Sequence, residues 1–356
     1  MLAWTARCSD VHVELVNTAP RRPAQEPRVW RRAMQGVGQA RRDLVGVLAH
    51  LFRHRPDTVH IATSGGLALA RDACVLLLTR LLRIRSSYHL HFGRLPETAD
   101  RGGMERAGFR LAMRLCTTVV VLDQASAAAA AKIQPAATVV LIPYFIDASE
   151  WRGAPPVPSA SATLSPTARP RRMRILYVGW VNEAKGMREL MTASAALAAR
   201  HDFELVLAGP GDPAFCSELE ALAGPSAAWY RLVGEVPREE VRPLMAATDI
   251  LVLPSHSEGF PYAILEAMSM GRAIVATSVG AVPQMLTHEG EPAGELVPPH
   301  DASALEKALD KLLADPVRRA ELGERARRAV ERRFTIEAAR GWYLELWTGK
   351  AGRRDR

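Results

Sequence analysis

The feature that most constrains the fold is the alternation of short apolar strand patterns with helical patterns along nearly the whole chain. Strands are expected at 11–16, 58–62, 86–91, 118–122 and 138–142 in the first half, and at 174–178, 203–208, 229–233, 250–254, 273–276 and 295–297 in the second. Such alternation is typical of parallel sheets whose strands are joined by crossover helices. The pattern therefore predicts an α/β protein with two doubly wound, Rossmann-like domains facing a cleft, where ligands bind beyond the carboxyl ends of strands.

Two domains are also expected from size, because 356 residues of which 48% are apolar exceed what one compact core usually holds. Residues 154–170 are rich in Pro, Ser, Ala and Thr, and this composition predicts a linker. The expected division is a first domain at 1–153 and a second at 171–334. Residues 335–356 are expected to form a C-terminal helix that packs back toward the first domain, because its apolar cluster at 342–347 needs a surface.

Cysteine spacing and hydropathy exclude several classes of protein. The four cysteines contain no Cys-x-x-Cys pair, which argues against a zinc site, a thioredoxin-like motif and a disulfide scaffold. The longest apolar stretch, at 74–82, is broken by Thr79 and Arg80 and falls short of the roughly 20 residues of a membrane span. The N-terminus also lacks the pattern of a signal peptide. We therefore expect a cytoplasmic protein without a membrane-spanning segment or a metal centre.

The formal net charge of +8 lies entirely in the first half. Residues 1–150 carry 20 Lys and Arg against 12 Asp and Glu, whereas residues 151–356 carry 26 of each. This asymmetry suggests an anionic partner for the first half, and the alternative is that its arginines are simply solvated. Nucleic acid is the least supported partner, because no aromatic-interleaved basic strand or zinc-finger spacing accompanies the charge.

A helical pattern at 28–55 combines seven arginines with apolar residues. Basic and apolar residues together predict peripheral contact with anionic lipid at the inner face of the plasma membrane. The competing interpretation is that the apolar side of this helix packs on the sheet. Both can hold, since only the arginines need to face lipid.

The segment DILVLPSHSEGFPYAILEAMSMG, residues 249–271, is the most informative stretch. A buried strand ends near Pro254, a polar loop follows, and Pro261 is expected at the first helical position. The amide end of this helix would then point into the cleft and could bind a phosphate, with Gly259 allowing close approach. Glu266 lies on an apolar run and needs partners such as ribose hydroxyls if it is buried. The ordinary alternatives are an acid favoured near a helix start for Glu266 and a solvated loop residue for Glu258.

A second segment, RILYVGWVNEAKGMR at 174–188, places Lys185 and Gly186 between a strand and the next helix. A lysine there can pair with a diphosphate as a point charge, although alone it is equally an ordinary surface residue. The segment matches neither the phosphate-binding loop of nucleotide hydrolases nor the G-x-G-x-x-G pattern.

The second half resembles the nucleotide-sugar domain of the retaining family 4 glycosyltransferases, which have the GT-B fold. The resemblance runs in order through ILYVGW, KG, LVLAG, LVGEV, SEGFPYAILEAMSMGRAIVATSVGAVPQML and GELVPPHDASAL. The first half resembles the acceptor domain of that family through VHIATSGG, SYHLHFG and LIPYFID.

The resemblance implies a role for each candidate site residue. Glu258 would contact the hydroxyls of the transferred sugar and Glu266 the ribose, while amides around Gly259 and Phe260 bind the diphosphate. Lys185 would neutralise the diphosphate. Gly179 and Val236 belong to loops beside the nucleotide, and the loop that contains Val236 would line the base. From the first domain His91 would approach the sugar, with His89 as the competing assignment and a satisfied strand-end histidine as the ordinary alternative.

The chain departs from the family pattern at several positions. Trp180 stands where the family commonly has an arginine, so donor affinity would depend more on Lys185 and the helix amides. The sequence 143–147 is Pro-Tyr-Phe-Ile-Asp instead of the usual Pro-Asn-Gly-Ile-Asp, and Gln284 stands where Glu is common. The first strand and its glycine-rich loop are not recognised near residue 1, so we expect either a start codon assigned too late or a lost first unit.

These observations predict a retaining, metal-independent glycosyltransferase that moves a sugar from a nucleotide diphosphate sugar to a polysaccharide or lipid-linked saccharide acceptor. No cofactor is expected beyond this co-substrate. No Asp-x-Asp occurs in the chain, so paired carboxylates of the kind that hold a divalent ion on the diphosphate are not found. Two alternatives remain open, an inactive nucleotide-sugar binding protein and a nucleotide-sugar epimerase of the same fold.

Overall fold

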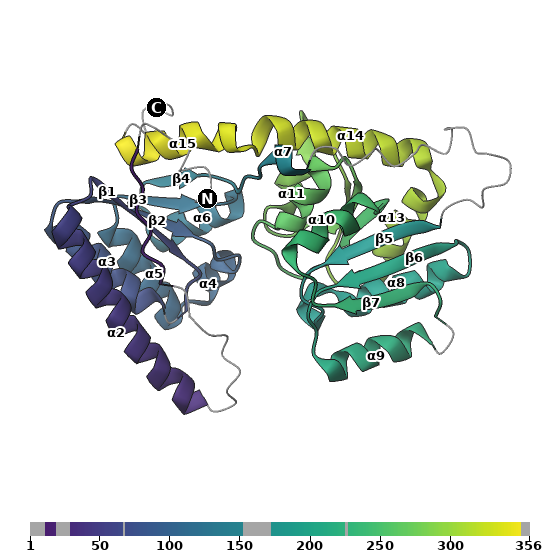
Figure 1. Cartoon of the computed structure of the whole chain (residues 1–356), viewed down its shortest axis with the longest axis horizontal. Coiled ribbons are helices and arrows are strands. Elements are labelled where there is room, and N and C mark those ends of the chain that lie inside the picture. Colours follow the sequence, from purple (N-terminus) through teal and green to yellow (C-terminus); the bar gives the residue numbers. More distant parts are fainter. Residues whose placement is uncertain (1–10, 19–28, 67, 152–171, 225–226, 350–356) are drawn as a thin grey trace. The chain divides into compact units, whose positions relative to one another are not determined.

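The computed structural model describes residues 11–18, 29–66, 68–151, 172–224 and 227–349, without side chains for 29–41. It divides the chain into two compact units (Figure 1). The first unit comprises Met1–Ile142 and Arg340–Arg356, and the second comprises Pro143–Ala339. The boundary between the two units therefore lies after residue 142, whereas the first domain was expected to end at residue 153. The expected linker at 154–170 lies outside the described residues.

The first unit is built on one parallel sheet with the strand order β1-β2-β3-β4. Its strands are β1 (Thr58–Thr63), β2 (Arg85–Leu90), β3 (Thr118–Val121) and β4 (Val139–Leu141). Its helices are α2 (Val29–His54), α3 (Ala68–Leu81), α4 (Leu95–Arg101), α5 (Gly103–Leu115) and α6 (Gln124–Ile133). These strands confirm four of the five expected in the first half. Each strand lies beside the strand that precedes it in the chain, always on the same side. Right-handed crossovers therefore place α3 to α6 on one face of the sheet.

The expected strand at 11–16 is wrong, because these residues are irregular and pair with no described strand. Its apolar side chains Val13, Leu15 and Val16 are exposed, so the alternating pattern VHVELV has no sheet face to cover. As a result, β1 has a strand neighbour on one side only among the described residues.

The two faces of this first sheet follow from the period of two along a strand. Tyr88 and Leu90 of β2 lie in the apolar cluster formed with α3, α5 and α6. The intervening His89 lies on the other face, where its ring is 6.4 Å from that of Tyr343. Tyr343 belongs to the C-terminal helix α15 (Ile336–Thr348), of which the residues from Arg340 onward group with the first unit. The end of α15 therefore covers the sheet face that has no crossover helices (Figure 1).

The apolar cluster expected at 342–347 is only partly buried. Tyr343, Leu346 and Trp347 are buried, whereas Trp342 is exposed because it lies off the face that these three share. The Nη1 atom of Arg85 donates to the carbonyl of Thr348 at 2.8 Å and attaches the end of the helix to the start of β2.

The second unit contains a six-stranded parallel sheet in the order β12-β9-β8-β5-β6-β7, of which Figure 1 labels β5, β6 and β7. Its strands are β5 (Met173–Val178), β6 (Phe203–Ala208), β7 (Tyr230–Gly234), β8 (Ile250–Leu253), β9 (Ala273–Thr277) and β12 (Glu295–Val297), and a short hairpin is formed by β10 (Thr287–His288) and β11 (Glu291–Pro292). All six sheet strands were expected from the sequence within about one residue. The central strands β5, β8 and β9 are fully apolar or nearly so, as buried parallel strands require.

The strand order reverses direction beside β5, the first strand of this unit. From β5 the chain moves outward to β6 and β7 and then returns to β8 on the other side of β5. Right-handed crossovers then place α8 and α9 on one face and α10 and α11 on the other. The helices are α7 (Ala148–Trp151), the 3-10 turn η1 (Glu183–Lys185), α8 (Met187–Ala198), α9 (Pro213–Ala223), α10 (Arg238–Ala246), α11 (Tyr262–Ser269), α12 (Val282–Met285), α13 (Ala302–Ala314) and α14 (Pro316–Arg333). The carboxyl ends of β5 and β8 therefore meet at a topological switch point, where such sheets bind ligands.

The stretch 143–151 belongs to the second unit because its backbone and side chains pack there. The N–H of Ile146 donates to the carbonyl of Phe334 at 2.8 Å, and Trp151 of α7 is buried. The ring of Tyr144 stacks on that of Tyr262 with centroids 4.8 Å apart.

Among the described residues, no helix combines the length and the apolar character that crossing a membrane would require.

Candidate functional site

Two loops of the second unit bring opposite charges together at the switch point. The first loop follows β5 and contains Lys185, and the second follows β8 and contains Glu258. Lys185 Nζ lies 2.5 Å from Glu258 Oε1, and Ser255 Oγ donates to the same oxygen at 2.7 Å. The N–H of His256 donates to the carbonyl of Ala184 at 3.0 Å, so the two loops also share a backbone hydrogen bond.

Two glycines allow these loops to approach each other. Gly186 has a φ of +68°, and a Cβ atom there would lie 2.0 Å from the carbonyl oxygen of Pro254. Gly280 has a φ of +53°, and a Cβ atom there would lie 2.0 Å from the carbonyl oxygen of Glu258. Only glycine fits both the left-handed conformation and the space. The position of Glu258 is therefore set by backbone packing on two sides.

The ion pair is largely sheltered from water. The side chain of Glu258 is 12% exposed and that of Lys185 is 27% exposed. Below it, the pKa of Tyr177 is raised by burial and by the nearby charge of Glu258. The Tyr177 hydroxyl donates to the carbonyl of Trp180 at 2.7 Å, while the Trp180 side chain is exposed. A charged pair this deep is stable only while each partner is compensated.

The helix expected after the second loop is present as α11. It begins at Tyr262, so Pro261 occupies the cap position and not the first helical position that was expected for it. No side chain caps this helix end among the described residues. Its first amides are therefore available to an anion. The side chain of Phe260 is buried against the rings of Tyr144 and Phe334, with centroids 5.7 and 5.6 Å away.

Glu266 lies one turn into α11 in a half-buried position. Burial raises its pKa to about 7, and the positive charge of Arg238 at the start of α10 offsets part of this increase. The pKa of the neighbouring Tyr262 is also raised by burial, with Arg238 lowering it and Glu266 raising it. The site therefore holds an acid that is partly protonated at neutral pH and lies within the electrostatic reach of a cation and a phenol.

The remaining candidates of the second unit lie in loops at the same edge of the sheet. Gly179 follows β5 directly, and its N–H donates to the carbonyl of Ala208 at 2.9 Å. The Gly259 carbonyl accepts from Ala281 N–H at 2.9 Å. Val236 is half-buried between β7 and α10. The structure thus gathers Lys185 and Glu258 in direct contact and places the other donor-side candidates on the adjacent loops.

In the first unit, the two candidate histidines differ in burial. His89 is fully buried, and its Nδ1 lies 3.2 Å from Nε2 of His60. His91 follows the end of β2, is half-buried, and lies with its ring centroid 4.1 Å from that of His89. Burial lowers the pKa of His91 to about 4 and that of His89 well below its usual value. His89 is therefore the histidine of the sheet interior, and His91 is a neutral imidazole at the strand end.

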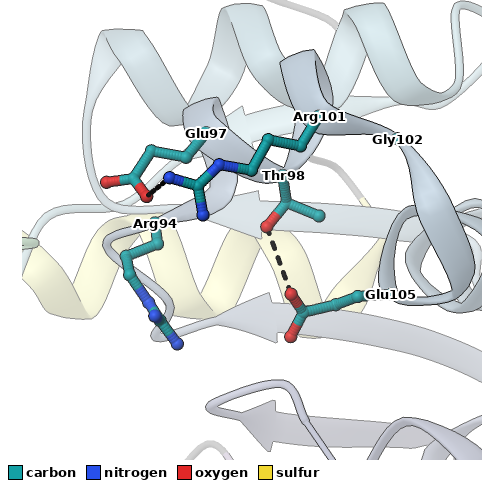
Figure 2. A pocket seen from close by; sticks show the side chains of 6 residues that line it. All are labelled: Arg94, Glu97, Thr98, Arg101, Gly102 and Glu105. Carbon is teal, nitrogen blue, oxygen red and sulfur yellow. Dashed lines mark hydrogen bonds and ion pairs between the residues drawn. The ribbon is translucent and has the colours of Figure 1, made fainter.

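The first unit also contains a small polar pocket between α4 and α5, shown in Figure 2. The residues that line it are Arg94, Glu97, Thr98, Arg101, Gly102 and Glu105. Arg101 pairs with Glu97 at 3.7 Å, and Thr98 Oγ1 donates to Glu105 at 3.4 Å. The guanidinium of Arg94 lies 5.5 Å from the ring centroid of Phe92. This pocket was not expected from the sequence.

Several contributors to the site were missed at the sequence level. Ser255 stands in the quoted motif next to Pro254, and its hydroxyl could have been recognised as a partner for Glu258. Arg238 carries no local signal, because its neighbour Glu266 is distant in the chain. The position of His91 relative to the donor site stays a prediction, because His91 belongs to the first unit and the donor site to the second.

Comparison with known proteins finds similarity in the second unit. Residues 172–315 match the family model described as "Glycosyl transferases group 1". The D-inositol 3-phosphate glycosyltransferase of Xylanimonas cellulosilytica is 33% identical over 208 residues, which are 56% of this chain and 49% of that protein. The phosphatidyl-myo-inositol mannosyltransferase of Mycolicibacterium smegmatis is 35% identical over 167 residues, covering 46% of this chain and 42% of that protein. The chain thus spans about half the length, or less, of these curated relatives.

Among solved structures, HepE of Anabaena in complex with UDP and glucose resembles this chain with a TM-score of 0.68. The likeness covers 86% of this chain and 81% of that one at 19% sequence identity. It confirms the predicted fold class, two Rossmann-like α/β domains of the GT-B type. The family match at 172–315 lies in the half of the chain where the resemblance to glycosyltransferases was expected.

Proposed function

We propose that this protein is a retaining glycosyltransferase that moves a sugar from a nucleotide diphosphate sugar to a polysaccharide or lipid-linked saccharide acceptor. The observation that carries the proposal is the Lys185–Glu258 ion pair at the switch point, beside the uncapped start of α11. A cation, free helix amides and a sheltered acid together suit a diphosphate linked to a sugar.

In this proposal, donor binding exchanges partners within the site. Without donor, Lys185 and Glu258 neutralise each other at 2.5 Å. The incoming diphosphate takes Lys185 as its counter-ion, and Glu258 then accepts hydrogen bonds from the sugar hydroxyls. Amides at Gly259 and Phe260 hold the phosphate oxygens, and Val236 lies beside the base. These groups stabilise the charge that develops on the leaving phosphate.

Glu266 is assigned to the ribose in the same scheme. Ribose hydroxyls donate to a carboxylate, so donor binding favours the ionised form of an acid whose pKa burial has raised to about 7. Transfer proceeds without a divalent ion on the diphosphate, which Lys185 and the α11 amides hold instead. From the first unit, His91 serves as a neutral hydrogen-bonding group toward the sugar.

Calorimetry with a panel of UDP-, GDP- and ADP-sugars tests the donor site. Lys185→Ala and Glu266→Ala should weaken donor binding about tenfold or more, whereas Glu258→Ala should reduce turnover more than affinity. Glu183→Gln is the matched control, because this neighbouring acid is 69% exposed. Wild-type kinetics in all three site variants would refute the assignment. Turnover without added Mg²⁺ or Mn²⁺, and NMR of the product's anomeric configuration, test the remaining parts of the mechanism.

The acceptor side is proposed to lie in the first unit, whose half of the chain carries the whole excess positive charge. The helix predicted at 28–55 is present as α2, Val29–His54. Near its end Leu51 is buried while Val45 and Phe52 are exposed, so its apolar residues are divided between the protein and solvent. Arginines beside exposed apolar groups favour peripheral contact with anionic lipid. Liposome sedimentation that does not depend on lipid charge would remove this part of the proposal.

A nucleotide-sugar binding protein without turnover is the second candidate. Two observations favour this function. Among the described residues β1 has a strand neighbour on one side only, and the side chain of Trp180 is exposed. Calorimetric donor binding without transfer or hydrolysis would support this function. Conversion of the donor in the absence of any acceptor would instead indicate a nucleotide-sugar epimerase.

A further inference from the structure

A cluster of one carboxylate and two imidazoles lies beside the donor loops and has no part in the proposed transfer. Glu189 lies in the first turn of α8, His256 in the loop after β8, and His300 two residues before the start of α13. Their ligand atoms all lie within 4.8 Å of one another. Three elements that are distant in the chain thus converge on one point.

The distances in the cluster suit a shared cation. Glu189 Oε1 lies 3.0 Å from His256 Nε2 and 3.7 Å from His300 Nδ1. Two atoms that each bind one zinc ion at about 2.0–2.1 Å in tetrahedral geometry lie roughly 3.3 Å apart. These two separations bracket this value, and the two imidazole rings, whose centroids lie 3.7 Å apart, would turn away from each other to bind one ion together.

Hydrogen bonding accounts for only part of the arrangement. The distance between His256 and Glu189 is that of a hydrogen bond, but the 3.7 Å between His300 and Glu189 is too long for one. The two imidazole rings nevertheless approach with centroids 3.7 Å apart. His300 also adopts a φ of +61°, a conformation that non-glycine residues rarely take. A shared metal ion would explain why two imidazoles gather at one carboxylate oxygen despite this backbone strain.

We propose that Glu189, His256 and His300 form a binding site for one zinc-type divalent metal ion. Two imidazoles and one carboxylate are a ligand set that zinc accepts, with a fourth position left for water. The side chains of Glu189 and His256 are 20% and 17% exposed, and that of His300 is 64% exposed, so the ion enters from the His300 side.

The ion would act on the loop between β8 and α11. His256 stands two residues before Glu258, and its backbone already contacts the loop of Lys185. Binding would fix this loop to α8 and α13 and restrict the movement of Glu258. The donor groups Lys185 and Glu258 are not among the ligands, so the ion is separate from the diphosphate chemistry proposed above.

The test is competition between the protein and a chromophoric chelator for Zn²⁺. It uses the full chain, stripped of metal and free of an affinity tag. The wild type should bind one tight equivalent, and Co²⁺ at the same site should show visible absorption typical of tetrahedral nitrogen and oxygen ligands. His300→Gly and Glu189→Gln should each weaken that equivalent by about 100-fold or more.

His300→Gly also keeps the test independent of folding. Glycine favours the left-handed conformation at this position, so the metal-free Tm should be unchanged or higher. Zn²⁺ should then raise the Tm of the wild type but not that of His300→Gly. Glu189→Gln removes the charge and can keep the hydrogen bond to His256.

His54→Ala is the matched control, because Glu14, His50 and His54 form a second, more exposed group of metal-ligating atoms. Loss of the tight equivalent in His54→Ala, or equal affinity in wild type and His300→Gly, would overturn the proposal. Absence of any binding tighter than about micromolar would also overturn it, and the only hydrogen bond among the three side chains would then be that between Glu189 and His256. Donor binding measured in parallel separates this outcome from a failure of the proposed function.

Discussion

The two units bury titratable groups of opposite kind. The first sheet holds His60, His89 and His91, whose pKa values are all lowered, mainly by burial. The second unit holds Glu266, whose pKa is raised by burial. At neutral pH the histidines are therefore uncharged in the folded protein and Glu266 is only partly charged, and each of these groups is charged more readily in the unfolded chain.

This difference teaches that the two units should respond to pH in opposite directions. A buried base destabilises the folded state as the pH falls, because the unfolded chain takes up the proton first. A buried acid destabilises the folded state as the pH rises, because the unfolded chain releases its proton first. Acid should therefore weaken the first unit and strengthen the site region of the second.

The largest expected effect is the acid sensitivity of the first unit. The pKa values of His60 and His91 are each lowered to about 4, against about 6.5 in the unfolded chain. Above pH 6.5 these histidines do not reduce the free energy of unfolding. As the pH falls from 6.5 toward 4, that free energy decreases because the unfolded chain binds protons first. Together they should cost on the order of 5 kcal/mol of stability over this range.

Urea unfolding followed by pulsed hydrogen exchange at one fixed labelling pH measures this loss separately in peptides of β2 and β8. The double variant His60→Gln, His91→Gln should lose much less stability between pH 6.5 and 4 in the β2 peptide. His12→Gln, at a side chain 86% exposed, is the control and should behave like the wild type. Equal losses in all three proteins would show that the histidines do not cause the acid sensitivity.

A smaller effect compares the loops that follow the first strand of each sheet. Gly186 and Gly66 have nearly equal φ values, +68° and +65°. A Cβ atom would lie 2.0 Å from the Pro254 carbonyl oxygen at Gly186, but would have no neighbour within 4 Å at Gly66. Gly66→Ala should therefore cost about 1–2 kcal/mol from backbone strain alone, and Gly186→Ala about 3 kcal/mol or more.

Equilibrium urea unfolding of both variants gives these two values. Gly186→Ala should also weaken nucleotide-sugar binding, because relief of the clash moves Lys185 away from Glu258. If the two variants lose the same stability, the close approach of the two donor loops is not a constraint on the fold.

The architecture of the second unit was predictable because buried parallel strands are continuous apolar runs with glycine and proline between them. The same reasoning failed at 11–16, where the alternating pattern VHVELV has side chains that stay exposed. Alternation shows that one face can be buried, but it does not supply a partner strand. Pairing is a long-range property, and nothing within this segment encodes it.

The candidate site shows the same limit. The strand order from β5 to β8 makes the switch point foreseeable, so contact between the loops of Lys185 and Glu258 follows from topology. The approach of Arg238 to Glu266 depends instead on how α10 and α11 lie on one face of the sheet. The grouping of His256 with His300 has the same origin, since strand spacing does not predict which loop side chains meet.

The smallest expected effect is the pH dependence of the site acid. The pKa of Glu266 is about 7 in the folded protein, against a usual value of 4.5. Folding therefore favours the uncharged form of Glu266. Its contribution to the free energy of unfolding is fully present below pH 4.5 and is lost as the pH rises through 7. Glu266→Gln should remove this dependence and raise stability at pH 8 by on the order of 3 kcal/mol.

Donor affinity should change with pH in the opposite sense, because ribose hydroxyls favour the carboxylate. Between pH 6 and 8 the diphosphate of UDP-glucose is fully ionised, so a rise in its calorimetric affinity reports on the protein. Wild-type affinity should increase across this range by about tenfold at most, with fewer protons released on binding at pH 8 than at pH 6.5. In Glu266→Gln the affinity should be lower and independent of pH, whereas Glu97→Gln, in the first unit, should leave the wild-type profile intact. A wild-type affinity that does not vary with pH would mean that Glu266 is held by Arg238 alone and does not meet the ribose.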